Sequence, residues 1–170
     1  MKRLKHREHL TVALALAALI AGALCPLPAG ADPDTLEVTA PSDITLGSLY
    51  GTGDATGTSA TNGSVKCDYA NGYTLTIKSS DADGKMYSGA NKLAAPLKVT
   101  AVLADGTGAT VTNTGNPTDA AVTTTPTTVG GTDASSTGTN VITLSVSQAR
   151  QTAGVAGTYS LTLTFTATAN

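Results

Sequence analysis

The sequence predicts an all-β fold: an antiparallel β-sandwich of two sheets, of the immunoglobulin-like or pilin-like kind, with about eight strands and long Gly/Thr-rich loops. Short runs in which apolar and polar residues alternate recur along the chain, separated by Gly, Pro, Asn and Asp. Alternation with a period of two is typical of a strand that buries one face. No segment shows the sustained 3.6-residue apolar stripe that the crossover helices of a parallel sheet would need.

The clearest strand is predicted at 157–169, where apolar side chains alternate with Ser and Thr. Other predicted strands, the first three strong and the rest weaker, are 72–79, 97–103, 141–146, 35–40, 44–49, 65–69 and 109–112. A single helical turn is predicted at 147–153. Two low-complexity stretches, 51–63 and 115–138, are predicted to be long surface loops, because their small polar side chains bury too little area to offset the entropy of ordering.

The first 31 residues have the pattern of a cleaved secretory signal peptide. A basic start is followed by an apolar stretch at 10–24, and the small residues Ala29 and Ala31 precede Asp32. The apolar stretch is shorter than the roughly 20 residues needed to cross a bilayer. We therefore expect cleavage after Ala31, one sandwich domain at 32–170, no transmembrane segment in the mature chain, and a secreted, extracellular or cell-surface location.

Removal of this leader would change the chemistry of the chain. Both histidines, His6 and His9, and one of the two cysteines would leave with it, and six basic side chains would face eleven acidic ones, a formal charge of −5. With this charge, one Phe and no Trp, nucleic acid is not an expected partner. Without His, no Ser/His/Asp or Cys/His catalytic arrangement can form, so no enzyme is expected. Cys67 is predicted to be a buried small hydrophobe, with a reactive or intermolecular thiol as the alternative.

Two segments carry carboxylates in patterns that suggest a site. The segment 105–108 (Asp-Gly-Thr-Gly) is predicted to be a hairpin turn. Ser79, Asp81 and Asp83, followed by Gly84, fit the first ligand positions of an EF-hand loop, but Ala stands where the bidentate Glu belongs. These three residues therefore make at most a weak calcium site, and an Asp-Gly turn is the favoured alternative; no other metal or cofactor is expected.

Two segments carry a resemblance to a family. The segments 72–75 (Gly-Tyr-Thr-Leu) and 156–161 (Ala-Gly-Thr-Tyr-Ser-Leu) resemble the aromatic-x-Leu strand and the closing strand of WxL-type bacterial cell-surface domains, with Tyr73 in place of the usual Trp. A weaker similarity is to fimbrial and spore-coat-U-like secreted subunits. The aromatic-x-Leu residues are predicted to be core anchors that meet between the sheets, with an exposed platform for stacking sugars as the alternative. These anchors are Tyr73, Leu75, Tyr159 and Leu161.

The resemblance implies a non-catalytic module of the cell surface or cell wall, structural or adhesive, whose partners are wall polysaccharide or other surface proteins. An alternative is a pilin-like fimbrial subunit that self-assembles by donor-strand addition, because Leu36, Val38 and Ala40 alternate in a segment that would serve a neighbour as a strand. A hydrolase that uses only carboxylates, such as Asp81 or Asp105, is the third class.

Overall fold

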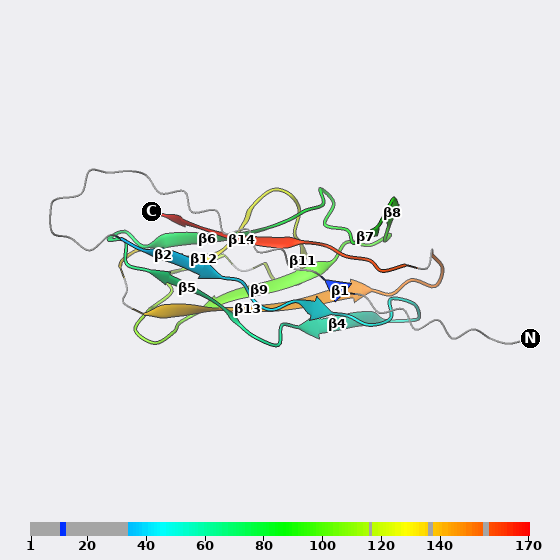
Figure 1. Ribbon diagram of the computed structural model, residues 1–170, viewed down its shortest axis with the longest axis horizontal. Helices are drawn as coiled ribbons and strands as arrows, with labels where there is room; N and C mark the ends of the chain where they lie inside the picture. Colours follow the sequence, from blue (N-terminus) through cyan, green and yellow to red (C-terminus); the bar gives the residue numbers. More distant parts are fainter. Residues whose placement is uncertain (1–10, 13–33, 116, 136–137, 155–156) are drawn as a thin grey trace, which may run out of the picture.

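The protein is built from antiparallel strands. The computed structural model describes residues 11–12, 34–115, 117–135, 138–154 and 157–170, and among these residues it contains no helix. Two large sheets account for most of the strands and pack against each other, which confirms the predicted all-β, antiparallel architecture (Figure 1).

The larger sheet is organised around its longest strand, β13 (Thr139–Ala149). One edge of β13 pairs with β9 (Lys98–Ala104), and the other edge pairs first with β5 (Gly63–Cys67) and then with β4 (Asp54–Thr58). The outer positions of this six-stranded sheet are held by β2 (Leu36–Thr39), which pairs with β5, and β11 (Ala120–Ala121), which pairs with β9.

The smaller sheet has four strands in the order β10-β12-β6-β14. Its centre is β6 (Tyr73–Ser79), which pairs with β14 (Leu163–Ala169) on one side and with β12 (Thr127–Thr132) on the other; β10 (Asn113–Thr114) extends it beyond β12. Two short ribbons complete the fold, one of β7 (Tyr87–Ser88) with β8 (Asn91–Lys92) and one of β1 (Thr11–Val12) with β3 (Ile44–Thr45).

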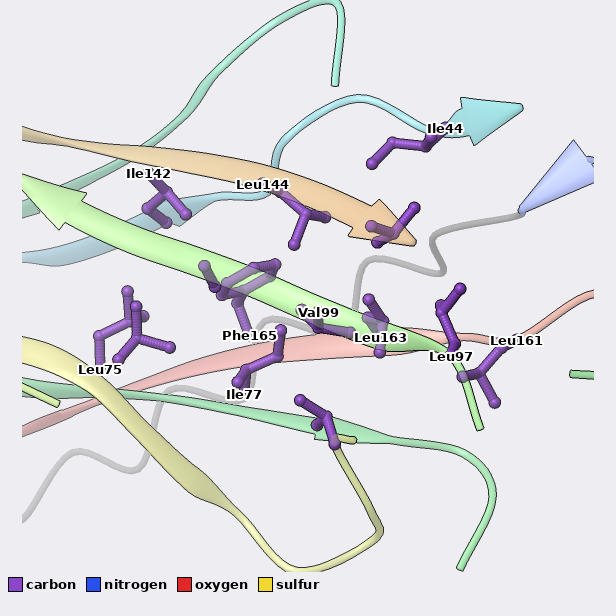
Figure 2. Close-up of a cluster of buried hydrophobic side chains, with 14 of the residues drawn as sticks. Ile44, Leu75, Ile77, Leu97, Val99, Ile142, Leu144, Leu161, Leu163 and Phe165 are labelled. Carbon is purple, nitrogen blue, oxygen red and sulfur yellow. The ribbon is translucent and has the colours of Figure 1, made fainter. Parts of the chain in front are cut away.

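The core fills the space between the two sheets. Leu75 and Ile77 of β6 and Phe165 of β14 face Val99 of β9 and Leu144 of β13, and all five side chains are buried (Figure 2). Each alternates along its strand with Ser, Thr or Lys residues that are at least partly exposed, as the sequence period predicts. Burial of about two dozen apolar side chains in one cluster is the main stabilising contribution to this fold.

Eight strands of the described residues have four or more residues, but they are not the eight predicted ones, because they include β4 and β12. The strands predicted at 35–40, 65–69, 72–79, 97–103 and 141–146 are confirmed, with boundaries that shift by one to three residues. The strand predicted at 109–112 is wrong, because that segment forms only a bridge between Gly106 and Ala109 before β10. At 44–49, only Ile44–Thr45 is a strand, and at 157–169 the regular strand begins at Leu163.

The prediction that 51–63 and 115–138 are loops is wrong, because β4 lies in the first segment and β11 and β12 in the second. Glycine residues allow close contacts in β4 and β12. A Cβ atom on Gly57 would lie 2.5 Å from the Ile44 Cγ2 atom, and one on Gly131 would lie 2.2 Å from the Tyr73 carbonyl oxygen. These residues mark places where a neighbouring chain segment approaches a strand closely.

The helical turn predicted at 147–153 is also wrong, because β13 continues through Ala149. Gln148 occupies the inward position that follows Leu144 and Val146, and its side chain is fully buried. Its Nε2 atom donates a hydrogen bond to the Ala95 carbonyl oxygen at 3.2 Å. Because this buried position of β13 holds a polar amide instead of an apolar side chain, the hydrophobic periodicity of the sequence underestimates the length of the strand.

Of the expected leader, the structure describes only Thr11 and Val12, which pair with Thr45 and Ile44; the remainder, including the expected cleavage site after Ala31, lies outside the described residues. Within the part of the chain that is described, no helix has the length and apolar character needed to cross a membrane.

Candidate functional site

The first aromatic-x-Leu segment lies at the start of β6, with Tyr73 and Leu75 both pointing into the core. The Tyr73 hydroxyl donates a hydrogen bond to the Asn140 Oδ1 atom of β13 at 2.9 Å, and the Asn140 Nδ2 atom donates to the Ala109 carbonyl oxygen at 3.2 Å. Burial raises the pKa of Tyr73, so the phenol stays protonated and remains a donor. This pair is a polar connection between the two sheets inside an apolar core.

The second aromatic-x-Leu segment is at the other end of the molecule. Tyr159 and Leu161 are buried just before β14, whose register places Leu163 opposite Ser79, whereas Tyr73 is opposite Ala169. Six residues of β6 therefore separate the two ends, roughly 20 Å. The four predicted anchors belong to one core but do not meet, and the burial of Tyr73 and Tyr159 leaves neither ring face open as a stacking platform.

The three residues of the predicted weak calcium site, Ser79, Asp81 and Asp83, lie at the end of β6 and in the tight turn that follows it. The Ser79 hydroxyl donates to the Asp81 carbonyl oxygen, and the Asp81 Oδ1 atom accepts hydrogen bonds from the backbone N–H groups of Asp83 and Lys85 at 3.0 and 3.1 Å. The Asp81 Oδ2 atom is paired with the Lys92 ammonium group from β8. The described residues contain no group of three or more His, Cys, Asp or Glu side chains arranged to hold a metal ion.

This turn has the geometry of an Asp-Gly turn: Gly84 has φ of +66°, and its N–H donates to the Asp81 carbonyl oxygen. The hydrogen bond from Lys92 is the main reason that the pKa of Asp81 is lowered, and the same contact raises the pKa of Lys92. Asp81 thus anchors the β7–β8 ribbon to the end of β6.

We expect the Asp81→Asn substitution to lower the free energy of unfolding by about 1 kcal/mol at neutral pH, because it removes a charge-assisted contact and retains the amide acceptor. The pKa of folded Asp81 lies below its usual value of about 3.9, so its stabilising contribution is complete above that pH and is lost as pH falls through the folded pKa. The melting temperature of the wild type should therefore fall more between pH 5 and about pH 3 than that of Asp81→Asn.

Asp83→Asn is the matched control for this experiment, because the hydrogen bond that Asp83 makes in the turn comes from its backbone N–H and not from its carboxylate. Calcium at millimolar concentration should leave all three melting temperatures unchanged. A calcium-dependent rise that both substitutions abolish would instead establish Asp81 and Asp83 as calcium ligands.

Cys67 is buried within a strand, and Asp105 makes a hydrogen bond in a tight turn. Cys67 is a free cysteine buried in β5, and burial is the main reason that the pKa of its thiol is raised, which disfavours the reactive thiolate. Asp105 lies in the tight turn predicted at 105–108, where Gly106 and Ala109 exchange backbone hydrogen bonds, and its Oδ1 atom accepts a hydrogen bond from the Val111 N–H at 2.7 Å.

The most regular polar surface of the six-stranded sheet was not predicted from the sequence. On the outer faces of β4, β13 and β9, the strand registers align Thr58 with Ser145 and Ser145 with Thr100 in one row, and Thr56 with Ser147 and Ser147 with Lys98 in the next. Neighbouring strands lie about 4.8 Å apart, and outward side chains along one strand about 6.7 Å apart. We call the five hydroxyl residues of these rows the hydroxyl grid: Thr56, Thr58, Thr100, Ser145 and Ser147.

The hydroxyl grid forms the floor of a hollow of about 400 Å³. One wall is Asp119, whose N–H donates to the Thr100 Oγ1 atom at 2.9 Å and whose carboxylate accepts from the Lys98 ammonium group at 2.9 Å. Asp119 has φ of +48°, the one positive value found among the described residues other than glycine. Ser147 donates to the Asp54 Oδ2 atom at 3.2 Å near the grid, where β4 begins.

Alternating Thr and Ser at 56, 58, 145 and 147 were visible in the sequence, but only the strand register brings them together. In comparisons with known proteins, no family model matches the chain, and no curated protein matches its sequence.

Proposed function

We propose that this protein is a secreted, non-catalytic module of the bacterial cell surface or cell wall, with a structural or adhesive role. Its fold is then an immunoglobulin-like sandwich that works by presenting its outer faces, and its partners are wall polysaccharide or other surface proteins.

The observation that carries this proposal is the composition of those outer faces. On the six-stranded sheet the hydroxyl grid is exposed or half-buried, and on the four-stranded sheet the registers align Thr166 with Thr76 and Thr168 with Thr74. Both sheets thus present rows of uncharged hydroxyl groups, each of which donates and accepts hydrogen bonds. Such faces suit the hydroxyl-rich, weakly charged polymers of a cell envelope.

The similarity to WxL-type surface domains supports the same proposal. Its two segments, at 72–75 and within 157–161, provide buried aromatic and leucine side chains at opposite ends of one core. The expected leader at 1–31 supports export.

The test is to express the full chain in a Gram-positive bacterium and to separate culture medium, wall and cytoplasm. We expect the protein in the medium and on the wall, without residues 1–31, and we expect purified exported protein to sediment with isolated cell walls. Protein that keeps its leader and stays in the cytoplasm, or that stays in solution when walls are sedimented, contradicts the proposal.

A second candidate is the pilin-like subunit, which one observation favours. β2, the segment expected to act as a donor strand, pairs with β5 in its own sheet and also contacts β14 of the other sheet, so it closes the side of the sandwich. Leu36 is buried there, and Val38 and Ala40 pack against the core. Its start is held by the N–H and hydroxyl of Thr35, which both donate to the Asp68 carboxylate.

A neighbouring copy would replace β2 in this position if subunits assemble by strand addition. Size-exclusion chromatography of the exported protein separates the two candidates. A ladder of stable polymers supports the pilin-like subunit, and a single monomer peak at high concentration contradicts it.

A further inference from the structure

We infer that the hollow above the hydroxyl grid binds a neutral polysaccharide chain across β4, β13 and β9. This inference rests on the proposed function and assigns the ligand class and the binding face.

The grid residues are positioned by a rigid part of the fold. β13 is the central strand of the six-stranded sheet, and the inward side chains between the grid residues, Leu144 and Val146, are buried in the core. The grid hydroxyls therefore sit on a surface whose spacing is set by backbone pairing rather than by mobile loops.

Part of the grid has unused hydrogen-bonding capacity. The side-chain hydroxyls of Thr56, Thr58 and Ser145 have no protein partner in the described part of the chain, whereas those of Thr100 and Ser147 bond to Asp119 and Asp54 at the margins. Three free hydroxyls in adjacent positions are thus available to a ligand, between two carboxylates that are acceptors for sugar hydroxyl groups.

The wall of the hollow is held in an unusual conformation. Asp119 adopts a left-handed backbone conformation, which is unfavourable for a residue other than glycine. Its contacts with Thr100 and Lys98 fix it there, and they place its carboxylate beside the exposed Lys98 ammonium group at the edge of the hollow. The Lys98–Asp119 pair offers both a donor and an acceptor to a polar ligand.

The chemistry of the lining selects the ligand class. The lining contains one apolar side chain, the buried Val146, so it lacks the apolar centre typical of protein interfaces. Asp119 in the lining and Asp54 at its margin outnumber Lys98, which disfavours a phosphate backbone. A chain of neutral sugars fits this lining. Its hydroxyl groups can form hydrogen bonds with the hydroxyl, carboxylate and ammonium groups of the hollow, and it carries no charge that the lining would have to neutralise.

The test uses the exported protein and two soluble hexasaccharides, one of β-linked glucose and one of β-linked N-acetylglucosamine. In ¹H–¹⁵N NMR titrations at millimolar sugar, we expect shifts confined to amides of β4, β13, β9 and the Asp119 loop. The sugar that gives the larger shifts indicates whether the polysaccharide ligand is built from glucose or from N-acetylglucosamine.

The decisive variant combines Thr56→Val, Thr58→Val and Ser145→Ala, which removes the three free hydroxyls with little change in shape. We expect it to keep the wild-type fold, judged from its spectrum, and to bind the better sugar at least about tenfold more weakly. The matched control combines Thr107→Val, Thr110→Val and Thr112→Val, three exposed residues of the segment that follows β9, and should bind like the wild type.

The inference is overturned if neither sugar shifts the grid amides, if the shifts lie on the four-stranded sheet, or if the grid variant binds like the wild type. Sedimentation with cell walls separates this failure from that of the proposed function. A protein that sediments with walls independently of the grid retains the proposed function and loses this site, and one that does not sediment at all loses both.

Discussion

Replacing Tyr73 by Ala should lower the free energy of unfolding by about 3–5 kcal/mol. The ring is buried at the start of β6, and its removal leaves a cavity between the sheets. Because a small domain has a total stability of only about 5–15 kcal/mol, this variant should be close to unfolding at 37 °C. Chemical denaturation followed by circular dichroism measures the change.

A finer substitution separates the ring from its hydroxyl group. Tyr73→Phe keeps the packing but leaves the Asn140 Oδ1 atom without its donor in a buried site, so we expect a loss of about 1–3 kcal/mol. The control is Tyr69→Phe, because Tyr69 is only partly buried and its hydroxyl has no partner among the described residues. Equal, small effects of the two substitutions would show that the Tyr73–Asn140 contact contributes nothing.

A double-mutant cycle then tests the connection between the sheets. Tyr73→Phe combined with Asn140→Leu removes both partners, so the double variant should be more stable than the sum of the single effects predicts, by on the order of 1 kcal/mol. Additive effects would mean that the two side chains act independently despite the 2.9 Å contact.

The same region shows how far the sequence alone determines the fold. β6, β9 and the central part of β13 were predicted because each buries every second side chain, and a register error of one residue would expose that whole row. The strong strands were therefore recognisable without any knowledge of their partners.

β4 and β12 were not recognisable, since their place in the sheets depends on contacts that the sequence does not display. β12 has four consecutive buried residues, Val129 to Thr132, with an irregular register between Thr128 and Gly130, so no alternation marks it. The small residues in these segments, which led to the prediction of loops, lie where neighbouring chain segments approach the strands closely.

The hydroxyl grid was hidden for a related reason. Its members come from segments separated by roughly forty residues or more, and each alone is an ordinary exposed position of a strand. A surface made by register across three strands is a property of the sheet, so sequence patterns reveal its rows but not their alignment. For the turn at Asp81, in contrast, the Asp-Gly pattern was sufficient, because its hydrogen bonds are local.

Gly72→Ala should be the second substitution with a large effect. Gly72 has φ of +72°, a left-handed conformation that costs other residues about 1–2 kcal/mol. A Cβ atom there would also lie 2.2 Å from the Thr132 carbonyl oxygen, where β12 pairs with β6, and the overlap adds about 1–3 kcal/mol. We therefore expect a total loss of about 2–5 kcal/mol in the free energy of unfolding.

Gly47 is the matched control, because its φ is nearly the same, +70°, and nothing lies within 4 Å of the position of a Cβ atom. Gly47→Ala should show the conformational cost alone. Asn tolerates positive φ better than Ala, so Gly47→Asn should recover part of the loss while Gly72→Asn should not. If the two positions respond alike, the close approach of Thr132 has no energetic weight. If Gly72 is the more sensitive position, a glycine is required before the aromatic-x-Leu strand because the end of β12 lies against it. Packing between the strands would then determine the residue type at both Gly72 and Tyr73.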